Sequence, residues 1–181
     1  GSRVVGLIGL GAIGHEAVKL LQPFGCKMYY YDVFRQEDFE KEYGVEYLSL
    51  DEIYEKCDII SYHVPVLDST RGMINKEAIA KMKQDAIIVN VARGDLMNNA
   101  DTAEALNAGK IYVAMDVIAP EPPTADDPLF HLNETGLARF SITPHIAGTT
   151  DDSFMRMSPW SYDNRARIEK GEKPINIVNG L

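Results

Sequence analysis

Cysteine is scarce in this 181-residue chain, which contains only Cys26 and Cys57. The two lack the spacing of metal ligands, and cysteines beside apolar strands usually behave as small hydrophobic residues. This pattern favours a reducing, cytoplasmic setting and predicts no metal site. Long apolar runs are also missing, since no segment approaches the ~20 residues of a membrane span. No signal-peptide pattern precedes the first apolar run.

Positive charge is scarce as well. The chain has 18 Lys and Arg residues against 27 Asp and Glu, which gives a formal net charge of −9. Such an excess of negative charge argues against a protein that binds nucleic-acid phosphates regardless of sequence. The sequence has no internal repeats and no low-complexity tracts. Hydrophobic residues make up 45%, as is typical of a globular protein, and we predict a single domain over residues 1–181.

The clearest pattern that is present lies between Val4 and Asp32. An apolar run at 4–8 predicts a strand, and the glycine-rich turn at 9–14 leads into a helix that ends near residue 21. A second apolar run at 28–31 ends on Asp32. This order of strand, glycine turn, helix, strand and acid is typical of a unit that binds dinucleotides.

Each glycine of the turn predicts a different contact. Gly9 lets the chain turn off the strand, Gly11 lets the backbone approach a pyrophosphate, and Gly14 lets the helix pack close to the strand. The helix N-terminus would offer N–H groups to the phosphates. Asp32 would accept from the ribose and repel a 2′-phosphate, which favours NAD over NADP, although Arg35 leaves NADP open. A structural βαβ unit without a ligand and a methyltransferase-like domain are the alternatives.

Apolar runs and helical patterns continue to alternate along the chain. Further strands are predicted at 45–48, 58–62, 86–91, 111–117 and 140–143, and helices at 36–43, 49–56, 75–82, 99–107 and 150–170, with a proline-rich loop at 120–128. Apolar strands that alternate with helices indicate a parallel sheet covered on both faces. The predicted fold is therefore α/β, a Rossmann-like doubly wound parallel sheet.

Several polar residues share one position relative to these strands. Each lies at or just after the carboxyl end of a predicted strand: Asp32, His63, Arg93, Asp116 and His145. In a doubly wound sheet these ends meet at the edge where ligands bind. We therefore expect the functional site at this edge.

Three polar residues suit hydride exchange with a 2-hydroxy acid. Such a reaction needs a nicotinamide, a group that exchanges a proton with the substrate oxygen, and a cation for the carboxylate. His145 can exchange a proton near neutral pH, and Arg93 has a planar fork that suits a carboxylate. Glu121 can pair with His145 and favour its protonated form. Taken singly, Arg93 and Glu121 would be ordinary surface charges, and His145 could merely end a strand.

The chain resembles the cofactor-binding domain of the D-isomer-specific 2-hydroxyacid dehydrogenases. The matching motifs come in the family's order and span nearly the whole chain: Gly9-Leu-Gly-Ala-Ile-Gly14, His63-Val-Pro65 with Thr70, Val89-Asn-Val-Ala-Arg-Gly94, Asp116-Val117 followed by Glu121-Pro122, and Thr143-Pro-His-Ile-Ala-Gly148. Together these motifs are highly specific.

The resemblance implies a role for each matched residue. Arg93 would bind the substrate, Glu121 would pair with the histidine, and His145 would be the acid/base. Asp116 would contact the nicotinamide carboxamide, and Thr70 with the loop before it would lie along the cofactor. The residues expected to bind NAD are Gly9, Gly11, Ala12, Ile13, Gly14, Asp32, His63, Val64, Pro65, Thr70, Val91, Ala92, Arg93, Asp116, His145 and Gly148.

One part of the family pattern is missing. Family members carry a separate substrate domain, and here only residues 1–3 precede the first strand. We expect Gly1-Ser2 to be a remnant of cloning, and residues 176–179 to begin a return toward the absent domain. Because catalysis needs a closed, dry cleft, we expect the chain by itself to bind NAD with little turnover.

The resemblance also bears on partners. It implies a homodimer formed through this domain and a small 2-hydroxy or 2-oxo acid substrate, whose identity the sequence does not give, with no nucleic acid or membrane partner. The same fold occurs in NAD-sensing transcriptional corepressors. Such a binding protein is the alternative, because the set of Arg93, Glu121 and His145 is compatible with either role.

Overall fold

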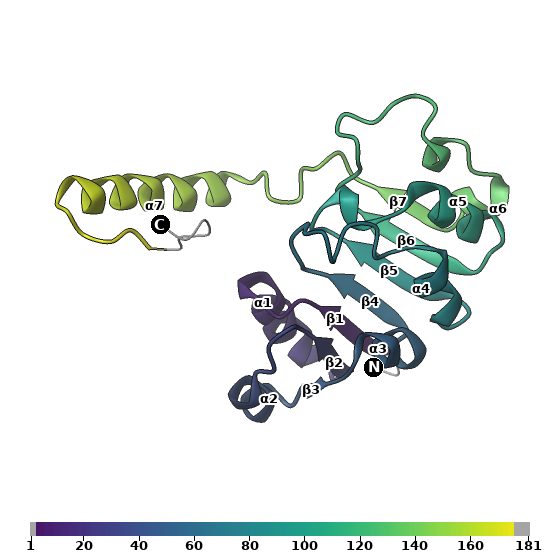
Figure 1. Ribbon diagram of the computed structural model, residues 1–181, viewed down its shortest axis with the longest axis horizontal. Helices are drawn as coiled ribbons and strands as arrows, with labels where there is room; N and C mark the ends of the chain where they lie inside the picture. The colour runs from purple at the N-terminus through teal and green to yellow at the C-terminus, as the bar shows by residue number, and fades with distance from the viewer. Residues whose placement is uncertain (1–2, 176–181) are drawn as a thin grey trace. The chain divides into compact units, whose positions relative to one another are not determined.

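A computed structural model describes residues 3–175, and Figure 1 shows its elements. The chain divides into two compact units, Gly1–Pro144 and His145–Leu181. The single domain expected from the sequence stays a prediction. The expectations for Gly1-Ser2 and for residues 176–179 lie outside the described residues.

The first unit is built on a seven-stranded sheet in which every neighbouring pair is parallel. Its strands are β1 (Val4–Ile8), β2 (Lys27–Tyr31), β3 (Glu46–Tyr47), β4 (Ile59–Tyr62), β5 (Ala86–Asn90), β6 (Ile111–Met115) and β7 (Phe140–Ile142). They lie in the order β3-β2-β1-β4-β5-β6-β7, so the winding reverses between β1 and β4. This order confirms the predicted Rossmann-like fold, in which ligands bind at the point of reversal.

Helices cover both faces of this sheet (Figure 1). The helical segments are α1 (Ala12–Leu21), α2 (Glu37–Tyr43), α3 (Leu50–Lys56), α4 (Lys76–Lys81), α5 (Asn99–Asn107) and α6 (Glu134–Leu137), with 3₁₀ turns η1 (Gln22–Phe24), η2 (Gly94–Leu96) and η3 (Pro128–Phe130). Successive side chains of a strand point to opposite faces. In β1, Val5 and Leu7 join the buried cluster that contains Val18 of α1, whereas Ile8 joins the cluster that contains Ile53 of α3.

Close packing of α3 on β1 depends on a glycine. An added Cβ at Gly6, in the middle of β1, would lie 2.7 Å from Cys57 Sγ and 2.8 Å from Ile53 Cγ2. The helix itself begins at a capping box, because the Ser49 Oγ accepts from the Glu52 N–H and the Glu52 carboxylate accepts from the Ser49 N–H. β1, which borders the point where the winding reverses (the switch point), is therefore in close contact with α3.

The second unit contains α7 (Asp151–Glu169) and is described by itself. Thr150 caps the helix by accepting from the Ser153 N–H at 3.1 Å. At the other end the Asn164 side chain bonds both backbone groups of Ile175, at 2.9 and 3.1 Å, so the chain after α7 returns along it. Across residues 3–175, none of the helices combines the length and apolarity that crossing a bilayer requires.

We predict that Gly6→Ala destabilises the chain by about 1–3 kcal/mol, because the added methyl group overpacks the contact between β1 and α3. Urea denaturation followed by circular dichroism measures this free energy. The double variant Gly6→Ala/Cys57→Ala should recover part of the loss, since it removes the nearest clashing atom. Equal losses in the single and double variants would show that the Cys57 contact does not limit the packing.

Candidate functional site

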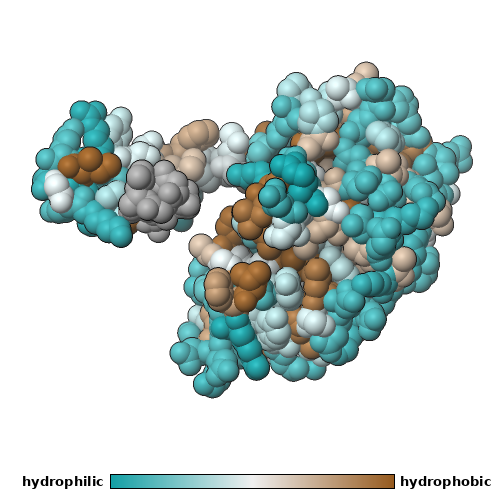
Figure 2. Space-filling model, viewed as in Figure 1, coloured by the Kyte–Doolittle hydropathy of each residue, from teal (hydrophilic) through white to brown (hydrophobic). Residues whose placement is uncertain are grey.

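A cavity of about 330 Å³ lies at the carboxyl ends of β1, β2 and β4, next to the switch point. Its walls come from the strand ends, the loops after them and the first residue of α3: Ile8, Gly9, Gly11, Tyr31, Asp32, Val33, Leu50, His63, Val64, Pro65, Leu67, Ser69, Thr70 and Met73. In Figure 2 hydrophobic residues, drawn in brown, lie among hydrophilic ones where Figure 1 labels α1, the helix that begins at the cavity. The cavity therefore combines apolar walls with a few polar groups, as small-molecule sites do.

The turn between β1 and α1 requires glycine at two points. Gly9 has a φ of 96°, and a Cβ there would lie 2.8 Å from the backbone carbon and oxygen of His63. A Cβ at Gly14 would lie 2.5 Å from the Gly9 carbonyl oxygen. These contacts bring the start of α1 against the end of β1 and the end of β4, as the glycine spacing predicts.

The third glycine has a different environment. Gly11 lines the cavity, and an added Cβ would meet nothing within 4 Å. As the N-cap residue of α1 it has no side chain that accepts from the first turn. The N–H groups of Ala12 and Ile13 are thus available to an anion, and the ten-residue helix adds a partial positive charge at this end. These features fit the pyrophosphate of a dinucleotide.

Asp32 follows the last residue of β2 and borders the same cavity. Its Oδ2 accepts from the Leu10 N–H at 2.7 Å, and its Oδ1 accepts from the Phe34 N–H at 3.3 Å. Each carboxylate oxygen can accept a further hydrogen bond. Asp32 is therefore held by the backbone in a position from which it can receive ribose hydroxyl groups.

His63 follows the end of β4 and is partly buried. Its Nε2 lies 2.9 Å from the Ser61 Oγ, and its N–H donates to the Ile8 carbonyl at 2.7 Å. Burial lowers the pKa of His63, so its ring is neutral at neutral pH. This environment suits a residue that shapes the cavity wall better than one that supplies a charge.

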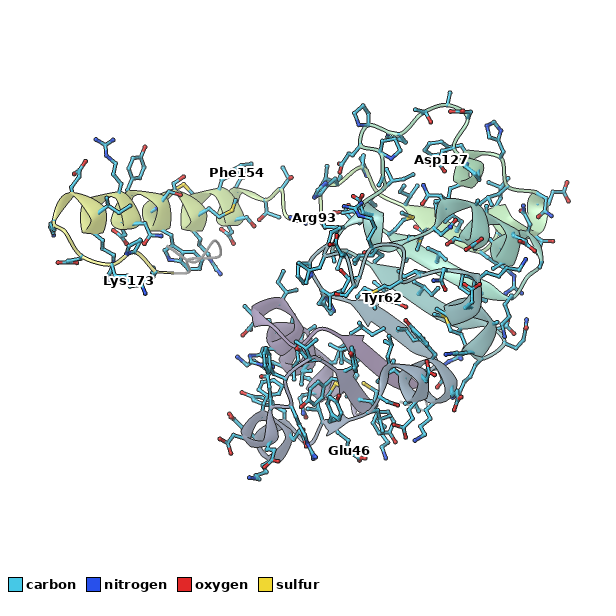
Figure 3. All side chains as sticks on the ribbon, viewed as in Figure 1. Glu46, Tyr62, Arg93, Asp127, Phe154 and Lys173 are labelled. Atoms are coloured by element: carbon cyan, nitrogen blue, oxygen red, sulfur yellow. The ribbon has the colours of Figure 1, made fainter. Side chains whose placement is uncertain are left out.

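The loop after β5 carries Arg93 and is held by a buried amide. The Asn90 side chain, fully buried, donates to the Arg93 carbonyl at 2.9 Å and accepts from the Ala92 N–H at 3.1 Å. Gly94 packs directly on the backbone of residues 118–119, where a Cβ would overlap it. Arg93 itself is exposed, and Figure 3 labels it at the sheet edge to which the strands point.

The loop after β6 is tied to the loop that carries Arg93. Asp116 is buried, its N–H donates to the Asn90 carbonyl at 3.1 Å, and its carboxylate accepts from the Thr143 hydroxyl. Asn99 donates to the Ala119 carbonyl at 3.1 Å, two residues before Glu121. The chain leading to Glu121 is therefore anchored to the chain that follows Arg93.

The structure brings together part of the predicted set. Seven of the residues expected to bind the cofactor line the one cavity: Gly9, Gly11, Asp32, His63, Val64, Pro65 and Thr70. Others lie in the first turn of α1 or directly after β5 and β6: Ala12, Ile13, Gly14, Val91, Ala92, Arg93 and Asp116. Glu121 lies exposed in the loop after β6 of the first unit, whereas His145 and Gly148 belong to the second unit. His145 has a φ of 53°, which is uncommon for a residue with a side chain.

Sequence reasoning included part of the apolar wall of the cavity, through Val64, Pro65 and the loop that leads to Thr70, where Leu67 lies. It did not include Tyr31, Leu50 or Met73, which also line the cavity. Of these, only Tyr31 carried a signal, since it precedes Asp32 and alternates with the buried Tyr30. Within residues 3–175, no group of three or more His, Cys, Asp or Glu side chains is arranged to hold a metal ion.

Comparison with known proteins connects this geometry to a family. The model of the family described as "D-isomer specific 2-hydroxyacid dehydrogenase, NAD binding domain" matches residues 1–147. A glyoxylate reductase of Korarchaeum cryptofilum is 39% identical over 178 residues, which cover 98% of this chain and 52% of the relative. The chain thus spans about half the length of the curated relatives that it matches.

Solved structures show the same likeness. The NAD-complexed D-isomer specific 2-hydroxyacid dehydrogenase of Lactobacillus delbrueckii ssp. bulgaricus has a TM-score of 0.83 and 32% identity, over 98% of this chain and 56% of that one. The holo form of Rhodotorula graminis D-mandelate dehydrogenase has a TM-score of 0.87 and 30% identity, over 99% of this chain and 52% of that one.

We predict that His63 makes the chain less stable in acid. Because burial lowers its pKa in the folded state below the unfolded value near about 6.5, protonation favours the unfolded chain. Its contribution to stability is complete above the unfolded pKa and is lost as the pH falls below it. The free energy of unfolding should therefore drop more in the unsubstituted chain than in His63→Gln between about pH 7.5 and pH 5. Urea denaturation at each pH measures this, and His131→Gln, at an exposed histidine, is the matched control. Parallel losses in the chain and in His63→Gln would contradict the prediction.

Proposed function

Because this chain belongs to the D-isomer specific 2-hydroxyacid dehydrogenase family, as an NAD-binding domain of it, we propose that it binds NAD in the cavity at the switch point and serves hydride transfer with a 2-hydroxy or 2-oxo acid. The observation that carries this proposal is the joint position of Gly9, Gly11 and Asp32 around one cavity. An anion-binding helix start and a fixed acid at that spot match the two parts of the cofactor that Rossmann domains grip most firmly.

The residues of the first unit would hold the cofactor in distinct ways. The N–H groups at the start of α1 bind the pyrophosphate, and Asp32 accepts from the adenosine ribose and repels a 2′-phosphate. Thr70 and the apolar wall around it lie along the cofactor. Asp116, held by Thr143, receives the nicotinamide carboxamide. NAD supplies the carbon that takes or gives the hydride.

Arg93, Glu121 and His145 form the proposed catalytic set. Arg93 pairs with the substrate carboxylate through its planar fork. His145 gives a proton to the carbonyl oxygen during reduction and takes it back during oxidation, and Glu121 is the proposed partner of its ring. Two observations support the set: Asn90 fixes the backbone at Arg93, and His145 keeps a left-handed backbone of the kind that persists at functional sites.

The relatives support the proposed substrate class. A glyoxylate reductase and a hydroxypyruvate reductase of Blautia hydrogenotrophica, 38% identical, act by their names on small 2-oxo acids. We extend that class to this chain. An NAD-sensing corepressor is the second candidate from the sequence, and no contact among the described residues favours it over the enzyme.

The proposal also covers location and assembly. Both cysteines are free thiols, and burial raises the pKa of Cys57 to about 12, so it is unreactive. Free cysteines support a reducing, cytoplasmic location. We carry over the homodimer from the family resemblance; several large apolar side chains of α7 are exposed, Trp160 among them at 61%, which suits a helix with a partner surface.

We predict that the chain binds NAD more tightly than NADP, and that Asp32→Ala weakens NAD binding by about 10–100-fold, as loss of a charged acceptor should. Isothermal titration calorimetry of the 181-residue chain with each dinucleotide measures both. Asp38→Ala is the charge-matched control, since that side chain is exposed and contacts only Lys41 in the ion pairs described. An unchanged NAD affinity in Asp32→Ala would rule out the assigned ribose contact.

We also predict little turnover by this chain alone, because it spans about half the length of its relatives and a closed cleft is needed for catalysis. The assay follows NADH absorbance with glyoxylate, hydroxypyruvate or pyruvate as substrate. Rates in the range of ordinary enzymes, about 1–1000 per second, would show that residues 1–181 suffice for catalysis and would contradict this prediction.

A further inference from the structure

Arg35 is the only cation between residues 32 and 40, and it follows Asp32 by three positions. From the sequence alone it leaves the choice between NAD and NADP open, because an arginine beside the ribose acid can accommodate a 2′-phosphate. The choice depends on where its guanidinium is held and whether its charge is already neutralised.

The structure pairs Arg35 with Glu40 of α2. The Arg35 Nε donates to Glu40 Oε1 and the Arg35 Nη2 donates to Glu40 Oε2, each at 2.9 Å. This is the bidentate geometry in which a guanidinium binds a carboxylate most strongly. The guanidinium carbon also lies 5.9 Å from the centre of the Tyr47 ring, so β3 flanks the pair.

Glu40 is a fixed partner. Its side chain is only 13% exposed, against 57% for Arg35. The hydroxyl of Tyr30, a fully buried residue of β2, donates to Glu40 Oε1 at 2.7 Å. The pair with Arg35 lowers the pKa of Glu40, which keeps the carboxylate charged. Exposed ion pairs are often weak. In this pair, however, the Glu40 carboxylate is largely buried and is held in place by the Tyr30 hydroxyl.

We propose that Glu40 determines cofactor specificity by holding Arg35: it engages one edge of the guanidinium, cancels its charge, and so withholds the only cation of this segment from the 2′-phosphate of NADP. The inference rests on the proposed binding of the ribose by Asp32. Rejection of NADP then has two parts, direct repulsion by Asp32 and capture of Arg35 by Glu40. Removing the first part alone should give only weak NADP binding.

The test uses calorimetric titration of the 181-residue chain with NAD and NADP in an Asp32→Ser background. Serine removes the repelling charge and keeps a short polar side chain at the end of β2. In that background Glu40→Gln keeps an oxygen that accepts from the Tyr30 hydroxyl, but it removes the charge that neutralises Arg35 and replaces the acceptor of Arg35 Nη2 with an NH2 donor, so Arg35 is held less firmly. We expect NADP to bind about tenfold more tightly than in Asp32→Ser alone, the size of one charge-assisted contact, and NAD affinity to stay within about twofold.

Two comparisons separate capture of Arg35 from a simple loss of negative charge. Glu37→Gln removes an equal charge from the first turn of α2, and we expect it to change NADP affinity less than about twofold. In Asp32→Ser/Arg35→Ala, adding Glu40→Gln should give no gain. A similar gain from Glu37→Gln, or a gain that survives Arg35→Ala, overturns the proposal.

A further variant does not depend on removing a partly buried carboxylate. In the Asp32→Ser background, Arg35→Ala should leave NADP affinity unchanged, because Glu40 already withholds the cation. A several-fold loss of NADP affinity overturns the proposal even where Glu40→Gln fails to fold, as judged by circular dichroism. Absence of NAD binding by the unsubstituted chain overturns the proposed function and this inference together, whereas NAD binding without the NADP gain overturns the inference alone.

Discussion

The candidate site depends on how the peptide groups of Leu10 are held. The Leu10 N–H donates to Asp32 at 2.7 Å, and the Leu10 carbonyl accepts from the Gln36 side chain at 2.7 Å. Both partners lie after β2, so the segment that follows the second strand fixes the turn that follows the first. Asp32 therefore shapes the surface against which a pyrophosphate would lie, in addition to its proposed contact with the ribose. The two subsites are mechanically linked, and an exchange of the acid acts on both.

Local groups decide how an acidic chain can bind an anionic cofactor. The net charge of −9 is repulsive at long range, but salt screens exposed charges beyond about 8–10 Å. The nearest donors are backbone N–H groups at the start of α1; Gly9 and Gly14 allow the close packing that positions this helix start, and Gly11 leaves the space beside it open to an anion. The same charge that excludes a general phosphate-backbone binder is thus compatible with one well-placed phosphate subsite.

The sequence was sufficient to predict the parallel sheet and to predict which residues follow the carboxyl ends of its strands, because parallel strands place these ends at one edge. For this reason it predicted that Asp32 and His63 would lie at the same edge, and both line the cavity there. It did not predict η2, η3 or α6, since three- and four-residue turns carry no periodicity. The sequence also did not predict the pair of Arg35 and Glu40, because that contact depends on how α2 packs against Tyr30. Where His145 lies relative to Arg93 depends on the join between the two units, which no local pattern specifies.

Tyr30 joins the two halves of this arrangement. Its buried hydroxyl accepts from the Gln36 N–H at 2.8 Å and donates to Glu40 at 2.7 Å. Burial raises its pKa to about 12, so the hydroxyl keeps its proton and remains a donor across the physiological range. Through Gln36 it supports the glycine turn, and through Glu40 it fixes Arg35. One phenol in the middle of β2 thereby links the segment that supports the glycine turn to the carboxylate that holds Arg35, so the proposed phosphate subsite and the nearest cation depend on the same buried hydroxyl.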